Sequence, residues 1–462
     1  MFINTDKALK IIAISIILVV GMTGVYAARG LYADGSYWLI EMLPRGGFYI
    51  FDAHRAYAQI LVQAPVALAL WLQVSDLNVL IRLHSFGSVG VPLLFWLVAL
   101  LLHLRTKLFW FFLLAFSVSY LRSNFFAAGE FSSAYGLTAL CTAILCRQKI
   151  GYALDVLLLA AAVALTRSYE ATLFLGVFLA AVVALRLIQM KNEHMGVKLA
   201  LIGSMLAFLF AVYLGANSVF FQRSYDGPGA ANLGALREIH LLYLLLMPAL
   251  AGALCTAYVG NRVRWEKMIS LAMVLLSGLY LLYSFRWDHS NISYGYLSYA
   301  YRGLCNFLLL GALSLAVALR FFPRLFGVDS KVEQASYLSV GVVVFFLSMA
   351  YPLVYHSYGF YKWAQRFEAQ AIALETHTPI DKTTINKNHG WTFGYNWPWG
   401  NPSTSILLRG NAGAVILNNS THTGPEPIDL TRIEKNPLLP ANLSGVAVGD
   451  QGRFQKPSLL YP

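Results

Sequence analysis

Residues 8–55 read ALKIIAISIILVVGMTGVYAARGLYADGSYWLIEMLPRGGFYIFDAHR, an apolar run that leads directly into a loop of acids, arginines and one histidine. The run from about Ala8 to Ala28 is close to the ~20 apolar residues that a helix needs to cross a bilayer. Its apolar core is longer than that of a typical signal peptide, so we interpret it as a retained first span, with a cleaved signal as the alternative. The polar loop then lies at a membrane surface, where charged side chains are costly unless they have a function.

The composition of the whole chain predicts an all-α polytopic membrane protein. Hydrophobic residues make up 58% of the 462 residues and charged residues only 12%, whereas soluble domains carry roughly 25% charged residues. Apolar runs near bilayer length recur along the sequence, unlike the short alternating segments of a barrel. The net charge of +12 is expected from basic cytoplasmic loops, so it does not indicate nucleic acid as a partner. The cysteines lie in apolar runs and are expected to be buried and free: Cys141, Cys146, Cys255 and Cys305.

Basic clusters set the expected topology, because lysine and arginine concentrate in cytoplasmic loops. Lys7 and Lys10 precede the first span, so we predict a cytoplasmic N-terminus. A scheme of about 11 spans keeps the later basic clusters cytoplasmic as well. After the first span, the spans are expected at 84–103, 108–122, 132–146, 151–166, 169–188, 198–215, 239–260, 268–284, 300–319 and 335–355. The chain then divides into a membrane domain, 1–355, and an exported tail, 356–462. We expect an integral protein of the bacterial inner membrane with a periplasmic C-terminus.

The first exported loop, 29–82, carries an isolated acid and two expected juxtamembrane helices. Asp34 directly follows the first span, and capping of the next helix is one interpretation of this residue. Residues 36–43 are expected to form the first helix, which Pro44 ends. Ala56–Val74 is apolar enough to cross the membrane, but a full crossing would export the next basic clusters. We therefore predict a helix that lies on or re-enters the outer leaflet, with a true span as the alternative.

The two sides of this topology carry different basic residues. Up to Lys331 every lysine is cytoplasmic, whereas the basic residues assigned to the outer side are all arginine. These are Arg29, Arg45, Arg55, Arg82, Arg122, Arg167, Arg223, Arg237, Arg286 and Arg302. The planar arginine fork suits two-point binding of phosphate, while snorkelling near helix ends is the simpler interpretation.

Two short exported loops each combine an arginine with a glutamate. Arg122 and Glu130 lie in the second loop, where a structural ion pair between them is one interpretation. Arg167 and Glu170 are three residues apart in the third loop, so on a helix they share a face and can pair. We expect both to point toward a polar cavity rather than toward lipid.

A longer exported segment and the tail are rich in aromatic residues. The segment 286–302 contains Arg286, Asp288, His289 and Arg302 among tyrosines and a tryptophan. Aromatic and polar groups together suit sugar rings, and they equally suit an interfacial belt.

The tail is expected to form a small mixed α/β domain. Residues 362–376 look amphipathic and indicate a linking helix. Ser405–Leu408 and Ala414–Leu417 have the character of short strands. The run 391–399 is dense in aromatic residues, which suits either contact with an acceptor or packing on the membrane domain.

Common nucleotide and hydrolase motifs are absent from the sequence. It has no phosphate-binding loop, dinucleotide-binding glycine fingerprint, His-Glu-x-x-His zinc motif or serine nucleophile elbow. ATP hydrolysis within this chain is therefore not supported.

The layout resembles the membrane glycosyltransferases of the GT-C fold, which use polyprenyl-phosphate sugars as donors. The resemblance rests on Asp34 within Tyr32-Ala-Asp-Gly, on Asp52-Ala-His54-Arg55 and on the exported tail. In that family an acid just after the first span acts as general base or positions the acceptor. Gly35 follows Asp34 where the family usually has a second acid, so a two-acid site is not supported. The resemblance implies no certain cofactor and leaves a divalent metal open. Subfamilies that modify pilins, lipid A or cell-wall glycans all fit.

The resemblance implies transfer of a sugar to a protein or glycan acceptor at the outer face, with inversion of the anomeric carbon. Asp34 is the expected base, and Glu130 is the second candidate. The side chains expected to hold the donor phosphate are Arg55, Arg122, Arg167, Arg286, Arg302, His54 and His289. Positioning of the acceptor is expected from Asp52, Tyr169, Glu170 and Asp288.

Two other functions stay open. An O-antigen ligase or polymerase would carry its largest exported loop late and between spans. A transporter or flippase of lipid-linked sugars would need central intramembrane charges and repeated halves. In this chain the long outer segments are the first loop and the tail, and the charges cluster at the outer ends of the spans, which favours the glycosyltransferase.

Overall fold

The computed structural model describes most of the first 220 residues and parts of the remainder. The described residues are 5–32, 34–123, 129–149, 151–190, 195–220, 223–224, 227–228, 267, 270–278, 281, 299–323, 337–373, 379–380, 401–408 and 417–418. Within these ranges the chain is helical apart from loops and four two-residue strands. The helices are α1 (Thr5–Tyr26), η1 (Arg29–Leu31), α2 (Asp34–Arg45), α3 (Ala56–Trp71), α4 (Leu77–Ser85), η2 (Phe86–Gly90), α5 (Val91–Leu102), α6 (Leu108–Val118), α7 (Tyr120–Ser123), α8 (Glu130–Leu145), α9 (Tyr152–Leu165), α10 (Thr172–Gln189), α11 (Met195–Phe220), α16 (Tyr299–Phe321), α17 (Tyr337–Ala373) and α19 (Asn401–Leu408). The strands are β1 (Arg223–Ser224), antiparallel to β2 (Gly227–Pro228), and β3 (Pro379–Ile380), parallel to β4 (Leu417–Asn418).

The helices confirm a helical membrane protein. Among the described residues, five helical segments are long and apolar enough to cross a bilayer, by length and composition. They are Thr5–Tyr26, Leu77–Leu102, Thr172–Gln189, Met195–Phe220 and Leu338–Ala369. Large hydrophobic side chains are exposed along α1, α9, α11 and α17, and apolar surface of this extent suits contact with lipid. Cys141, Cys146 and Cys305 are buried, as expected, and form no disulfide among the described residues, while Cys255 lies outside these residues.

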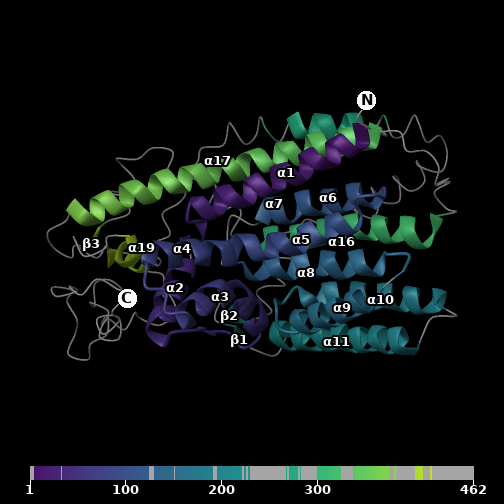
Figure 1. Cartoon of the computed structure of the whole chain (residues 1–462), viewed down its shortest axis with the longest axis horizontal. Coiled ribbons are helices and arrows are strands. Elements are labelled where there is room, and N and C mark those ends of the chain that lie inside the picture. Colours follow the sequence, from purple (N-terminus) through teal and green to yellow (C-terminus); the bar gives the residue numbers. More distant parts are fainter. Residues whose placement is uncertain are drawn as a thin grey trace.

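The bundle is built around α8. Every residue of α8 is buried, and α3, α5, α9 and α10 pack against it. On one side α1 and α17 run next to each other, and α10 and α11 lie on the opposite side (Figure 1). The N-terminus lies at the right end of the bundle, whereas α2, α3, α4 and α19 gather at the left end (Figure 1). The loop after α1 is therefore at the opposite end from the N-terminus.

The segment predicted to lie on or re-enter the membrane forms α3. Its 16 residues extend about 24 Å at the usual helical rise, less than the ~30 Å hydrocarbon core. It packs on α4, η2 and α8. The backbone of η2 approaches so closely that a Cβ on Gly87 would lie 1.7 Å from the carbonyl oxygen of Val62. Only glycine permits this contact, which fixes α3 against the membrane bundle. Its depth in a bilayer stays a prediction.

The structure corrects several predicted boundaries. The prediction of a strand at Ser405–Leu408 was wrong, because these residues belong to the helix α19, which packs on α2 and α17. The expected span 335–355 and the expected helix 362–376 form one helix, α17. The first loop helix extends from Asp34 through Pro44 to Arg45, and Gly46 then adopts a left-handed φ of 62°. The expected span 239–260 and residues 414–416 lie outside the described residues.

Candidate functional site

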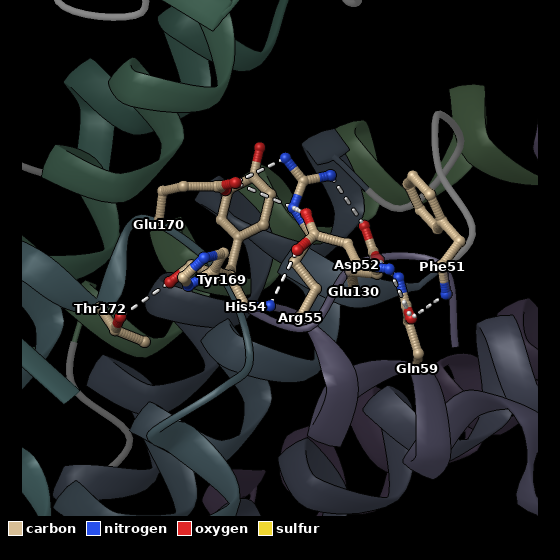
Figure 2. Close-up of polar contacts among 9 residues, drawn as sticks. All are labelled: Phe51, Asp52, His54, Arg55, Gln59, Glu130, Tyr169, Glu170 and Thr172. Carbon is tan, nitrogen blue, oxygen red and sulfur yellow. Dashed lines mark hydrogen bonds and ion pairs between the residues drawn. The ribbon is translucent and has the colours of Figure 1, made fainter. Parts of the chain in front are cut away.

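Arg55 is the centre of a buried polar cluster that joins three segments distant in sequence (Figure 2). Its Nε and Nη2 donate to Oε1 of Glu170 at 2.9 and 2.6 Å. Its Nη1 donates to Oε2 of Glu130 at 3.2 Å. Oδ2 of Asp52 lies 3.5 Å from Nε. One guanidinium thus faces three carboxylates, which suits the five donors of the arginine fork.

The backbone around Arg55 explains why these groups meet. Arg55 directly precedes α3, and the N–H groups of Tyr57 and Ala58 donate to the carbonyl oxygen of Arg167 at 3.0 and 3.4 Å. This carbonyl satisfies donors that the first turn of a helix leaves unpaired. It therefore ties the loop between α9 and α10, which carries Glu170, to the start of α3.

Glu130 enters the cluster from the first residue of α8. Gly129 before it has a φ of 85°, a conformation that glycine adopts without strain. The carbonyl oxygen of Gly129 accepts from the backbone N–H of Ser133 at 2.9 Å and from its hydroxyl at 2.8 Å. The turn thus aims Glu130 at Arg55 from the N-terminal end of a buried helix, where a negative charge is favoured.

Two glutamines one turn apart on α3 hold the first loop in place. Nε2 of Gln59 donates to Oε1 of Glu130 at 2.9 Å, and its Oε1 accepts from the backbone N–H of Phe51 at 3.2 Å. Gln63 accepts from the N–H of Tyr49 at 2.8 Å and donates to its carbonyl oxygen at 2.7 Å. Both amides are fully buried. They bind the extended segment before Arg55 as a neighbouring strand would.

Burial governs the electrostatics of the cluster. The pKa of Glu130 is raised to about 7 overall: burial is the largest cause, the charge of Arg55 and the hydrogen bond from Gln59 lower the pKa, and the nearby carboxylates of Glu170 and Asp34 add to the rise. Burial also opposes the charge of Arg55, but Glu170 and Glu130 outweigh it and raise its pKa. Arg55 therefore stays protonated, while Glu130 can gain or lose a proton near neutral pH.

The remaining polar groups of Figure 2 frame the cluster. The guanidinium carbon of Arg55 lies 5.1 Å from the ring centroid of Tyr169. The carbonyl oxygen of Tyr169 accepts from the hydroxyl of Thr172 at 2.7 Å. The backbone N–H of His54 donates to Oδ1 of Asp52 at 2.8 Å, and the ring of His54 is partly exposed. The cluster thus has an accessible edge at His54 and Asp52.

Asp34 lies close to this cluster but not within it. It is the first residue of α2 and is partly exposed. Its charge raises the pKa of both Glu130 and Tyr32 after the larger effect of burial. Asp34 and Glu130, the two predicted base candidates, therefore lie within electrostatic range of each other although 96 residues separate them. The predicted roles of both stay predictions.

The predicted pairing of Arg167 with Glu170 was wrong. Residues 166–171 form turns rather than a helix, so Arg167 and Glu170 do not share a helix face. The side chain of Arg167 is exposed, and Glu170 bonds to Arg55 instead. Glu130, for which a pair with Arg122 was one interpretation, bonds to Arg55 and Gln59, and the side chain of Arg122 lies outside what the structure describes.

Other predicted site residues are not placed. The structure describes the backbone of Arg122 and Arg302 but not their side chains, and Arg286, Asp288 and His289 lie outside the described residues. Among the described side chains, no group of three or more His, Cys, Asp or Glu is arranged to hold a metal ion.

Sequence reasoning missed Gln59 and Gln63. Their signal was present, since two amides four residues apart in the apolar stretch 56–74 lie on one helix face. Buried amides need partners, so the pattern predicts a polar structure against that face.

Comparison with protein-family models, with curated proteins and with solved structures found no match for this chain.

Proposed function

We propose that the protein transfers a sugar from a polyprenyl-phosphate donor to a protein or glycan acceptor at the outer face of a membrane. The observation that carries the proposal is the buried carboxyl of Glu130, whose pKa of about 7 suits a general base at neutral pH. Asp34 lies in electrostatic range of it at the same end of the bundle. Asp34 follows the apolar helix α1 and Glu130 begins the buried helix α8, and a lipid-borne donor would approach at this end of the bundle.

The topology that fits this function has about 11 spans, with a cytoplasmic N-terminus. The bundle end with α2, α3 and α19 then faces the periplasm of a bacterium, and the tail forms a small periplasmic domain. The opposite placement of the N-terminus and α2 supports this orientation (Figure 1).

In the proposed reaction the carboxylate of Asp34 or Glu130 takes the proton of the acceptor hydroxyl. The oxygen attacks the anomeric carbon as the bond from that carbon to the phosphate oxygen breaks. The electron pair leaves with polyprenyl phosphate, and the anomeric configuration inverts. A partly dry site strengthens the interaction of fixed cations with the leaving phosphate.

The contacts of Arg55 refine its role within this proposal. Its donors already meet Glu130, Glu170 and Asp52, so Arg55 positions these carboxylates. The phosphate is then held by other predicted cations: Arg122, Arg167, Arg286, Arg302, His54 and His289. The acceptor is positioned by Asp52 at the accessible edge, together with Tyr169, Glu170 and Asp288.

The test uses purified protein and a polyprenyl-phosphate sugar of defined structure. Asp34→Asn and Glu130→Gln each remove a charge with little change in shape, and at least one should abolish transfer with the protein still folded. Glu41→Gln is the matched control and should leave transfer unchanged, because among the described residues Glu41 forms its ion pair with Arg45, one turn away on α2. Normal transfer by both Asp34→Asn and Glu130→Gln would refute the proposed function with one of these carboxylates as the base.

A proton-coupled transporter of lipid-linked sugars is the second candidate. It is favoured by a buried carboxyl that exchanges its proton near pH 7, since such groups mark proton pathways in membrane proteins. Movement of a labelled lipid-linked sugar across a proteoliposome membrane, driven by a pH gradient and without transfer to any acceptor, would select this function.

A further inference from the structure

Exposed and half-buried aromatic and cationic side chains gather where α1, α4 and α17 meet. We name this group the Tyr26 patch; it consists of Tyr26, Arg82, Tyr358, Tyr361 and Lys362. Tyr26 and Tyr358 are 60% and 55% exposed, and Arg82 is exposed as well. None of these residues takes part in the polar cluster around Arg55.

Specific contacts fix Arg82 in the patch. Its Nη1 donates to the carbonyl oxygen of Tyr26 at 3.0 Å, and its guanidinium carbon lies 4.8 Å from the ring centroid of Tyr26. The rings of Tyr26 and Tyr361 are 5.6 Å apart. The guanidinium is therefore held over an aromatic face with further donors available to a ligand.

Lys362 supplies the second cation of the patch. Its Nζ lies 5.7 Å from the ring centroid of Tyr358 and 5.9 Å from that of Tyr361. The hydroxyl of Tyr361 accepts from Nε2 of Gln365 at 2.8 Å. Within the part of the chain that the structure describes, neither Arg82 nor Lys362 forms an ion pair. Among the described residues, the patch therefore presents two positive charges that no acid pairs with.

The position of the patch relates it to the membrane surface. Tyr26 is the last residue of the apolar segment Thr5–Tyr26, Arg82 lies in the first turns of Leu77–Leu102, and Lys362 lies near the end of Leu338–Ala369. Tyrosine is enriched at membrane interfaces, and long basic side chains reach from helix ends to lipid headgroups. The patch thus gathers residues from one end of three candidate spans, which is where a spanning helix meets lipid headgroups.

We propose that the Tyr26 patch binds the phosphate of an anionic phospholipid. The arginine fork offers two parallel donors to phosphate oxygens, and Lys362 adds a point charge beside it. The exposed rings cover the glycerol and the upper acyl chains, where one side of a ring is apolar and the hydroxyl is wet. This site is independent of sugar transfer and would exist equally in a transporter.

The experiment uses native mass spectrometry of the full-length purified protein in neutral detergent. It measures how many lipid molecules bind and the affinity of the tightest one as lipid is added. Phosphatidylglycerol is compared with phosphatidylcholine of the same chains. Each cation near a lipid phosphate contributes about fivefold in affinity, so Arg82→Gln/Lys362→Gln should bind the tightest phosphatidylglycerol about 25-fold more weakly. Arg82→Lys/Lys362→Arg keeps both charges and should remain within about fivefold of wild type.

The matched control is Arg105→Gln/Lys149→Gln, which removes the same charge from two exposed residues at the other end of the bundle. It should leave the tightest binding unchanged. An equal loss in this control would overturn the proposal, because the effect would then come from total charge. Equal affinity for phosphatidylcholine, or tighter binding of polyprenyl phosphate than of phosphatidylglycerol at this patch, would overturn it as well.

Discussion

Replacement of Arg55 by methionine tests whether one buried cation holds the site together. The variant keeps the apolar stem but removes the guanidinium that bonds to Glu170 at 2.6 Å and to Glu130 at 3.2 Å. Because both carboxylates are left buried without their cation, we expect the free energy of unfolding to fall by about 3–5 kcal/mol. Reversible unfolding in mixed micelles containing dodecyl sulfate, followed by circular dichroism, measures this quantity.

Arg45→Met is the matched control for this experiment. Arg45 pairs with Glu41 one turn earlier on α2, and its side chain is 27% exposed against 10% for Arg55, so solvent screens its charge more and the expected loss is smaller. A loss below about 1 kcal/mol for Arg55→Met, or equal losses for both variants, would refute the reasoning. The fall in the free energy of unfolding caused by Arg55→Met should be smaller at acid pH, because protonated Glu130 carries no charge for Arg55 to neutralise. A fall that is independent of pH would show that it does not come from the lost charge.

Three further outcomes follow from the same geometry. Because burial raises the pKa of Glu130 to about 7, the carboxylate forms as the pH rises, so transfer should increase about tenfold from about pH 6 to about pH 8 in a rate profile. Gly129→Ala should lower the melting temperature much more than Gly196→Ala. Gly129 has a φ of 85° and a Cβ there would lie 2.8 Å from a backbone oxygen, whereas a Cβ on Gly196 would meet open space. Equal melting temperatures for the two variants would argue against this turn. Gln63→Leu removes the amide that bonds to both backbone groups of Tyr49 and should make the first loop more sensitive to limited proteolysis, which unchanged cleavage would contradict.

The sequence predicted most helix positions within a few residues. The expected spans 151–166 and 169–188 correspond to α9 (Tyr152–Leu165) and α10 (Thr172–Gln189). A helix satisfies its own backbone hydrogen bonds, so a continuous apolar stretch in lipid has few alternatives. The turn at Gly46 after α2 is also a local feature: Gly46 and Gly47 are adjacent, and Gly46 adopts a positive φ that glycine favours.

The strand predicted at Ser405–Leu408 failed because short apolar runs do not distinguish helix from strand. Contacts of α19 with α2 and α17 decide the matter. Propensity over a few residues is weak, and tertiary packing overrides it.

The sequence by itself determined that the chain is a helical membrane protein with an acid-rich loop after its first span. It could not determine which charges meet. Arg55 was expected to bind a ligand and Glu170 to pair with Arg167, but the fold brings Arg55 to Glu170 and Glu130 across 115 and 75 positions of sequence. Apolar periodicity is encoded locally, whereas a charge pair depends on how whole helices pack, and only the tertiary structure brings these three segments to one point.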